Sequence, residues 1–198
     1  MLDFFKSDTA ASKALSTVDW DSWFYKPGLP PKPDFDTSMV DKCYALAENW
    51  ESEVMSSCPI PGACADSNFK SYSPNPSDIE GLTANQIVVF LERIQLFKTP
   101  LTAKQSQAMG KAYSLTSSRN VELISRYLGI ALTAKDETAY QPAADLLGKV
   151  GRMKFVRPLY RKLNAVDRKL ALKTFEKHKD FYHPICKAQV EKDLKEGE

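Results

Sequence analysis

The chain has few of the residues that build metal centres and nucleophilic active sites. Its 198 residues include only two histidines, His178 and His183, and four cysteines. Neither histidine belongs to an HExxH pattern, and no CxxC pair is present. The GxSxG, P-loop and GxGxxG patterns are also missing. We therefore expect no complete catalytic site and no metal site in this chain, and we expect both histidines to cap or line helix ends.

Long apolar stretches are missing as well. No run of about 18 consecutive apolar residues exists, so we expect no membrane-spanning helix. Near the start, Phe4 and Phe5 are flanked by charged residues, which is unlike the apolar core of a signal peptide. The cysteines are too sparse for a disulfide framework, although Cys58 and Cys64 could pair when oxidised. These absences favour a cytoplasmic protein with reduced cysteines and no membrane partner.

The charge of the chain is small overall and unevenly placed. The net charge is +2, but residues 149–198 hold 14 Lys and Arg against 7 Asp and Glu, a local charge of +7. The first 148 residues carry the remaining 13 basic and 18 acidic residues, a local charge of −5. This asymmetry favours an anionic ligand or partner for the last third of the chain.

The first 36 residues differ from the rest of the chain. Residues 19–25 are rich in aromatic side chains, and residues 27–33 contain four prolines. Proline fixes φ and restricts the residue before it, so residues 27–33 are predicted to form an extended, semi-rigid strap. The aromatic rings would anchor this strap on a surface. The sequence therefore predicts a connecting segment at 1–36 and a separate domain at 37–198.

From residue 37 onward, apolar residues recur with the period of a helix. A first helix is predicted from one apolar face, which consists of Met39, Cys43, Leu46, Ala47 and Trp50. Residues 52–76 are rich in Ser and Pro, include Gly62, and are predicted to form an irregular loop. Capping boxes at Thr83-x-x-Gln86 and Thr102-x-x-Gln105 predict two helix starts. Further helices are predicted from 121, from about 137 to 147, around 155–163, around 170–175 and from 184 to 194.

This pattern of seven or eight helices with short connections and no clear strand predicts an all-α fold. Consecutive short helices pack as antiparallel pairs, so we expect layered helix pairs in an armadillo- or HEAT-like α-solenoid. No repeat of fixed length is visible in the sequence, so no specific repeat family is assigned.

A cluster of cations stands at one predicted helix junction. Residues 151–158 contain Arg152, Lys154 and Arg157 within six positions. The planar guanidinium of Arg152 matches a carboxylate, and Lys154 adds a point charge. Backbone N–H groups at a helix start would strengthen such an anion site. From the residues alone, a solvated basic surface remains an open alternative.

Glycine and proline surround this cluster. Gly148 and Gly151 are predicted to let the backbone turn between two helices, and Pro158 is predicted to lie in the first turn of the second helix.

Several segments together resemble the C-terminal region of leukotriene A4 hydrolase and related M1 zinc aminopeptidases. The resemblance extends in order over nearly the whole chain. The segments that carry it are VDWDSWFYKPGLPP at 18–31, GRMKFVRPLY at 151–160, EKHK at 176–179, HP at 183–184 and KDLK at 192–195. The sequence departs from the family pattern in a longer loop at 52–75, and it lacks one residue after Pro31.

The resemblance implies a role for this chain within a larger enzyme. It implies that a preceding catalytic domain carries the zinc and the catalytic side chains, with residues 1–36 as its end and connecting strap. It also implies that Arg152 receives the carboxylate of a peptide substrate, with Lys154 assisting. The chain would then be a substrate-recognition and packing domain that is not catalytic alone, whose partner is the catalytic domain of the same polypeptide.

Two other functions are open to a helical domain of this kind. An independent α-helical scaffold for protein–protein interaction is the main alternative. Nucleic-acid binding through the basic last third is disfavoured, because that third lacks both a helix-turn-helix signature and the interleaved aromatic residues of single-strand binders.

Overall fold

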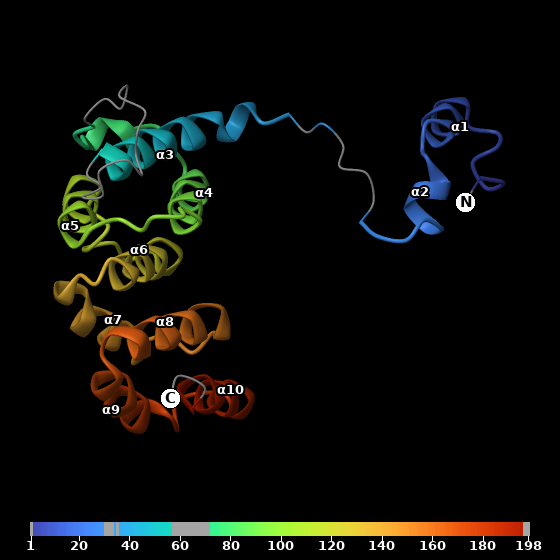
Figure 1. Cartoon of the computed structure of the whole chain (residues 1–198). Helices are drawn as coiled ribbons and strands as arrows, with labels where there is room; N and C mark the ends of the chain where they lie inside the picture. The colour runs from blue at the N-terminus through green and yellow to red at the C-terminus, as the bar shows by residue number, and fades with distance from the viewer. Residues whose placement is uncertain (1, 30–33, 35, 57–71, 196–198) are drawn as a thin grey trace. The chain divides into compact units, whose positions relative to one another are not determined.

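The computed structural model describes residues 2–29, 34, 36–56 and 72–195 of the chain. The chain divides into two compact units, Met1–Thr37 and Ser38–Glu198. The described residues of both units form helices joined by turns and loops, without a strand (Figure 1). The predicted all-α fold class is therefore confirmed. No helix among the described residues is long and apolar enough to cross a membrane.

The first unit contains two short helices, α1 at Thr9–Ser16 and α2 at Trp20–Phe24. Asp8 and Asp19 cap them, because their carboxylates accept hydrogen bonds from backbone N–H groups of the first turn. Both helices are missing from the sequence-based prediction, although an aspartate at the N-cap is a recognisable signal. Residues 30–33 of the predicted strap lie outside the described residues.

The second unit contains eight α-helices and two short 3₁₀ helices in its described part. The α-helices are α3 (Ser38–Ser56), α4 (Ala84–Gln95), α5 (Ala103–Ala112), α6 (Val121–Thr133), α7 (Tyr140–Leu147), α8 (Met153–Val166), α9 (Arg168–His178) and α10 (Pro184–Lys195). The 3₁₀ helices are η1 (Pro76–Ile79) and η2 (Glu137–Ala139).

Both predicted capping boxes start helices. At α4, the Gln86 N–H donates to Thr83 Oγ1 at 3.3 Å and the Thr83 N–H donates to Gln86 Oε1 at 2.9 Å. Thr102 and Gln105 repeat the same reciprocal pair at α5. Each box satisfies two backbone donors that a helix start would otherwise leave free.

The end of α3 differs from the prediction. Residues 52–56 are helical instead of forming the start of a loop, because Val54 is buried four positions after Trp50 and extends the apolar face. Residues 57–71 of the predicted loop, including Cys58 and Cys64, lie outside the described residues. The apolar face predicted for this helix also included Met39, which is 75% exposed.

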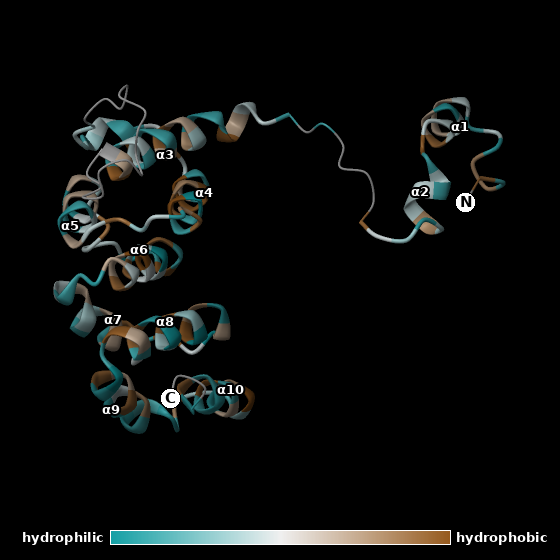
Figure 2. Ribbon diagram, in the orientation of Figure 1, coloured by the Kyte–Doolittle hydropathy of each residue, from teal (hydrophilic) through white to brown (hydrophobic). Residues whose placement is uncertain are grey.

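Alternate helices of the second unit pack against one another. Helix α4 contacts α6, α6 contacts α8, and α8 contacts α10, while α5, α7 and α9 pack beside this row (Figure 1). These helices carry both apolar and polar residues, as expected when one face of a helix is buried and the other is exposed (Figure 2). The contacts show layered helix packing, and the solenoid description remains a prediction.

Helix α8 lies at the centre of the contacts that matter for the predicted site. It buries one stripe, Val156, Leu159, Tyr160 and Leu163. The Tyr160 and Tyr182 hydroxyls lie 3.0 Å apart, and the Tyr182 hydroxyl donates to the Leu147 carbonyl at 2.7 Å. These bonds satisfy the polar ends of two buried rings, so the orientation of α8 is fixed by both packing and hydrogen bonding.

The glycines before α8 do not serve as left-handed turns. Gly148 ends α7 with a φ of −75°, which any residue adopts. A Cβ at Gly148 would lie 2.7 Å from the His178 ring, so the position requires glycine because of a close approach. A Cβ at Gly151 would meet only Phe181, at an ordinary 3.7 Å. Both glycines lie in the connection between α7 and α8, as predicted, but neither has the positive φ that glycine adopts more readily than other residues.

Pro158 also differs from its predicted place. It lies inside α8, beyond the first turn of a helix that begins at Met153. Without an N–H, Pro158 cannot donate to the carbonyl of Lys154 four residues earlier. The helix continues because its buried stripe extends on both sides of the proline.

Replacing Gly110 of α5 by alanine is expected to destabilise the second unit. An added Cβ would lie 2.1 Å from the hydroxyl of Tyr127, whose side chain is buried and cannot move aside. We expect Gly110→Ala to lower the free energy of unfolding by about 1–3 kcal/mol. Urea unfolding followed by circular dichroism measures this change.

The matched control is Gly129→Ala in α6, where the added Cβ would contact the flexible end of Lys162 at 3.3 Å. Alanine is favoured over glycine inside a helix by about 1 kcal/mol, so this variant should be no less stable than the parent chain. An equal loss of stability at both positions would contradict the packing argument.

Candidate anion-binding site

The segment that contains the predicted site residues opens α8. Arg152 is the N-cap residue, with extended backbone angles, and no side chain caps this helix start. Its side chain is exposed and makes no hydrogen bond or ion pair with any described residue. The N-terminus of a 14-residue helix carries partial positive charge and free N–H groups. Arg152 therefore adds a full charge and a planar set of donors beside an electropositive helix end.

Lys154 is placed differently from Arg152. Its Nζ donates to both carboxylate oxygens of Glu122, at 2.8 and 2.7 Å, and lies 5.4 Å from the centre of the Phe155 ring. The side chains of Lys154 and Glu122 are 45% and 34% exposed. An exposed pair of this kind is weak, so an incoming carboxylate can compete with Glu122 for Lys154.

Glu122 belongs to a larger network of charges. It also accepts a bond from Arg126 at 2.5 Å, and Arg126 donates to Glu92 at 2.6 Å. The bonds from Lys154 and then Arg126 hold the pKa of the Glu122 carboxyl below its usual value, so Glu122 is charged at neutral pH. The network joins α4, α6 and α8, and it neutralises Lys154 in the absence of a ligand.

Arg157, the third cation of the cluster, has a structural role. Its Nε and Nη2 donate to the two carboxylate oxygens of Asp193 at 2.8 and 2.9 Å, and Arg161 donates to the same carboxylate at 2.7 Å. The Asp193 side chain is only 2% exposed. This arrangement ties α8 to α10 and directs Arg157 away from the predicted anion site.

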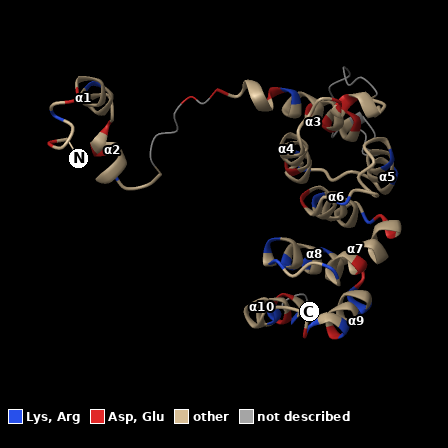
Figure 3. Ribbon diagram, turned by 180° about the vertical axis from the view of Figure 1, so that it is seen from behind, with Lys and Arg blue, Asp and Glu red and all other residues tan. Residues whose placement is uncertain are grey.

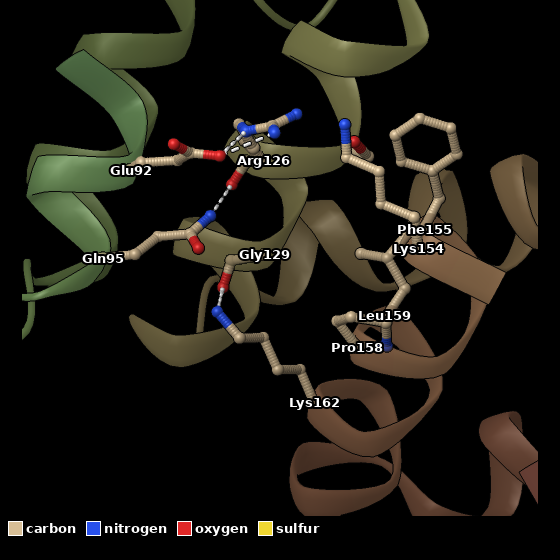
Figure 4. A pocket seen from close by; sticks show the side chains of 10 residues that line it. Glu92, Gln95, Arg126, Gly129, Lys154, Phe155, Pro158, Leu159 and Lys162 are labelled. Carbon is tan, nitrogen blue, oxygen red and sulfur yellow. Dashed lines mark hydrogen bonds and ion pairs between the residues drawn. The ribbon is translucent and has the colours of Figure 1, made fainter. Parts of the chain in front are cut away.

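A pocket of about 220 Å³ lies between α4, α6 and α8 (Figure 4). Lys154 lines it, together with Arg126, Gln95 and Lys162, while Arg152 does not. The structure therefore places the two predicted residues at the start of one helix without bringing them into one pocket. The basic residues of α8 and α9 are spread along both helices (Figure 3).

The acidic partners of the cations, and Lys162, are absent from the site predicted from the sequence. The four-residue spacing of Glu122 and Arg126 on one helix is a signal that could have revealed their ion pair. The contacts of Glu122 with Lys154 and of Arg126 with Glu92 join different helices, so no local pattern predicts them.

The histidines lie where the sequence analysis expected them. His178 is the last residue of α9, and the Nδ1 atom of His183 accepts the N–H of Ile185 at the start of α10. Among the described residues, no group of three or more His, Cys, Asp and Glu side chains is placed to hold a metal ion.

The chain is similar to known proteins over nearly its whole length. Residues 82–194 match a family model described as leukotriene A4 hydrolase, C-terminal. A leukotriene A-4 hydrolase homolog of Botryotinia fuckeliana is 69% identical over 99% of this chain and 28% of its own length. Leucine aminopeptidase 2 of Sclerotinia sclerotiorum is also 69% identical, over 99% of this chain and 29% of its own length.

A solved structure shows the same fold. Native yeast LTA4 hydrolase matches with a TM-score of 0.76 and 40% sequence identity, over 96% of this chain and 31% of that one. The chain thus spans less than a third of the length of the relatives that it matches.

Replacing Asp193 by asparagine is expected to remove an acid-sensitive contribution to stability. The hydrogen bonds from Arg157 and Arg161 lower the pKa of the Asp193 carboxyl below its ordinary value, although burial opposes them. The carboxylate therefore stabilises the fold above the unfolded pKa of about 3.9, and this contribution is lost as pH falls through the lower folded pKa. At pH 7 we expect Asp193→Asn to lower the free energy of unfolding by about 1–3 kcal/mol.

Urea unfolding of both proteins between pH 7 and pH 2 measures the difference. The difference should be constant above about pH 5 and should shrink below about pH 4, because only the parent chain protonates at this position. A difference that is the same at pH 7 and pH 2 would show that the charge of Asp193 is not what stabilises the contact.

Proposed function

The chain belongs to the leukotriene A4 hydrolase C-terminal family, and from this premise we propose that it is the substrate-recognition and packing domain of a zinc aminopeptidase. In this proposal Arg152 receives the carboxylate of a peptide substrate and Lys154 assists. The chain is not catalytic alone. Relatives named leucine aminopeptidase support a peptide as the substrate class.

The observation that carries this proposal is the guanidinium of Arg152 at the uncapped start of α8, which pairs with no residue that the structure describes. An arginine can bind a carboxylate through two parallel hydrogen bonds, and the free N–H groups of the helix start favour the same anion. Among the described residues, seven other α-helices have a side chain that accepts an N–H at their start, namely α1, α2, α4, α5, α6, α9 and α10, whereas α7 has none. At α8 this place is open to a ligand.

Lys154 fits an assisting role because its ammonium is already oriented. Glu122 holds the ammonium by two hydrogen bonds, and a bound carboxylate would share its donors. Arg152 supplies direction and Lys154 supplies charge, which matches the different chemistry of the two side chains.

The proposed zinc belongs to the catalytic part of the parent polypeptide. The described residues of this chain do not offer a set of ligands that fits a zinc ion. The contribution of the chain is therefore to bind one end of the substrate and to hold it in a fixed direction.

Replacing Arg152 by alanine in the full-length enzyme tests the proposal. We expect kcat/KM for short peptides with a free C-terminal carboxylate to fall about tenfold to a hundredfold, because one charged hydrogen bond is lost. Steady-state kinetics on the same peptides with amidated C-termini should show little change.

Arg119→Ala is the matched control, because it removes an exposed arginine that does not belong to the cluster. Unchanged kinetics of Arg152→Ala on free-carboxylate peptides, with folding intact, would refute the role of Arg152.

A further inference from the structure

One cation in the pocket between α4, α6 and α8 has no acidic partner among the described residues. Arg126 and Lys154 are both paired with glutamates, whereas Lys162 forms no ion pair within the described part of the chain. Its Nζ donates one hydrogen bond, to the carbonyl oxygen of Gly129 at 2.9 Å. That oxygen also accepts the hydroxyl of Thr133 at 2.9 Å. An ammonium group has three donors, so Lys162 is only partly satisfied.

A lysine with so few partners is unusual in the surroundings of Lys162. The side chain is half-buried, and burial lowers the pKa of its ammonium group. Removing a charge from water is unfavourable unless an opposite charge or several hydrogen bonds compensate it. A bound anion would provide the compensation that the protein itself does not.

Gly129, a buried residue of α6, lets two side-chain nitrogens come close to the helix. A Cβ at Gly129 would lie 3.3 Å from Lys162 Nζ and 3.5 Å from Gln95 Nε2. Both nitrogens therefore lie close to α6 at Gly129, and Figure 4 shows each of them directed to a backbone carbonyl of that helix. Gln95 Nε2 uses one N–H to donate to the Arg126 carbonyl at 3.0 Å, and its second N–H remains for a ligand.

The remaining walls of the pocket favour a small organic ligand. Phe155, Pro158 and Leu159 provide an apolar side from α8. The volume of about 220 Å³ equals roughly seven water molecules at about 30 Å³ each. Glu92 also lines the pocket, and its negative charge disfavours a doubly charged ion such as phosphate.

We propose that this pocket, called here the Lys162 pocket, binds a small carboxylate with a short apolar group. The carboxylate contacts Lys162 Nζ and Gln95 Nε2 over Gly129, and the apolar group packs on Phe155, Pro158 and Leu159. The ligand is either a short branched organic acid or the last residue of a peptide. This site uses other residues than Arg152, and the proposal does not depend on the proposed function of Arg152.

Titration of Lys162 by NMR in the 198-residue chain tests this proposal. The Cε signal of Lys162 is followed against pH without ligand, with isovalerate and with the neutral isovaleramide. A carboxylate binds the protonated ammonium more tightly, so isovalerate should raise the pKa of Lys162 and isovaleramide should not. An unchanged pKa of Lys162 at about 100 mM isovalerate would overturn the proposal, because even a weak site would be partly filled at that concentration.

Variants separate this pocket from the start of α8. Gly129→Ala crowds Lys162 Nζ and Gln95 Nε2, and Lys162→Met removes the ammonium but keeps the stem. Both should weaken isovalerate binding about tenfold or more, measured in every variant from the shifts of backbone amide signals as isovalerate is added. Gly151→Ala is the matched control, because its methyl group would contact only Phe181 and should leave binding unchanged. Binding that survives in both Gly129→Ala and Lys162→Met would overturn the assignment.

Arg152→Ala tests whether isovalerate binds at the start of α8 instead, and a second ligand, N-acetylleucine, tests which carboxylate the pocket prefers. Isovalerate binding should persist in Arg152→Ala. If binding is lost in Arg152→Ala but retained in Gly129→Ala, the ligand lies at the start of α8 and the Lys162 pocket is refuted. N-acetylleucine represents the last residue of a peptide. Tighter binding of N-acetylleucine than of isovalerate would assign the pocket to peptide C-termini, and the reverse order would assign it to small organic acids.

Discussion

The buried stripe of α8 fixes the direction of every charged group on that helix. Val156, Leu159, Tyr160 and Leu163 pack inward, so the other positions of α8 have fixed angles around its axis. Arg157 and Arg161 are one turn apart, and both reach Asp193 on α10. Lys154 and Lys162 are two turns apart, and both line the pocket toward α4 and α6. One apolar stripe thus sorts the cations of α8 into a structural pair and a pocket-facing pair.

The two pairs differ in how their charge is compensated. The carboxylate of Asp193 is buried and accepts three donors, so breaking this contact leaves an uncompensated charge in the interior. The carboxylate of Glu122 is one-third exposed and shared between Lys154 and Arg126, so its partners can be exchanged at little cost. A tightly compensated pair holds the helix in place, whereas loosely compensated cations remain available for a ligand.

Local sequence signals predicted much of the fold and only part of the site. The capping boxes at Thr83 and Thr102 were sufficient to place two helix starts, because their hydrogen bonds span four residues. The cation cluster around Arg152 was also visible, because its members lie within six positions of one another. The bond from Lys154 to Glu122 spans 32 residues and exists only because α6 and α8 pack side by side. Pairing of this kind depends on tertiary structure, so a local pattern cannot separate a free cation from a paired one.

Gly129 shows how a missing side chain shapes the same surface. Glycine inside a helix is less favourable than alanine by about 1 kcal/mol, so α6 is weakened at this position. In return, the absence of a side chain lets Lys162 Nζ approach the Gly129 carbonyl oxygen to 2.9 Å, an approach that a methyl group 3.3 Å from Nζ would crowd. The Lys162 ammonium lies in the same pocket as Gln95 and donates one of its three N–H groups to the Gly129 carbonyl. The pocket therefore forms where the flexible Lys162 side chain of α8 reaches the backbone of α6 at Gly129.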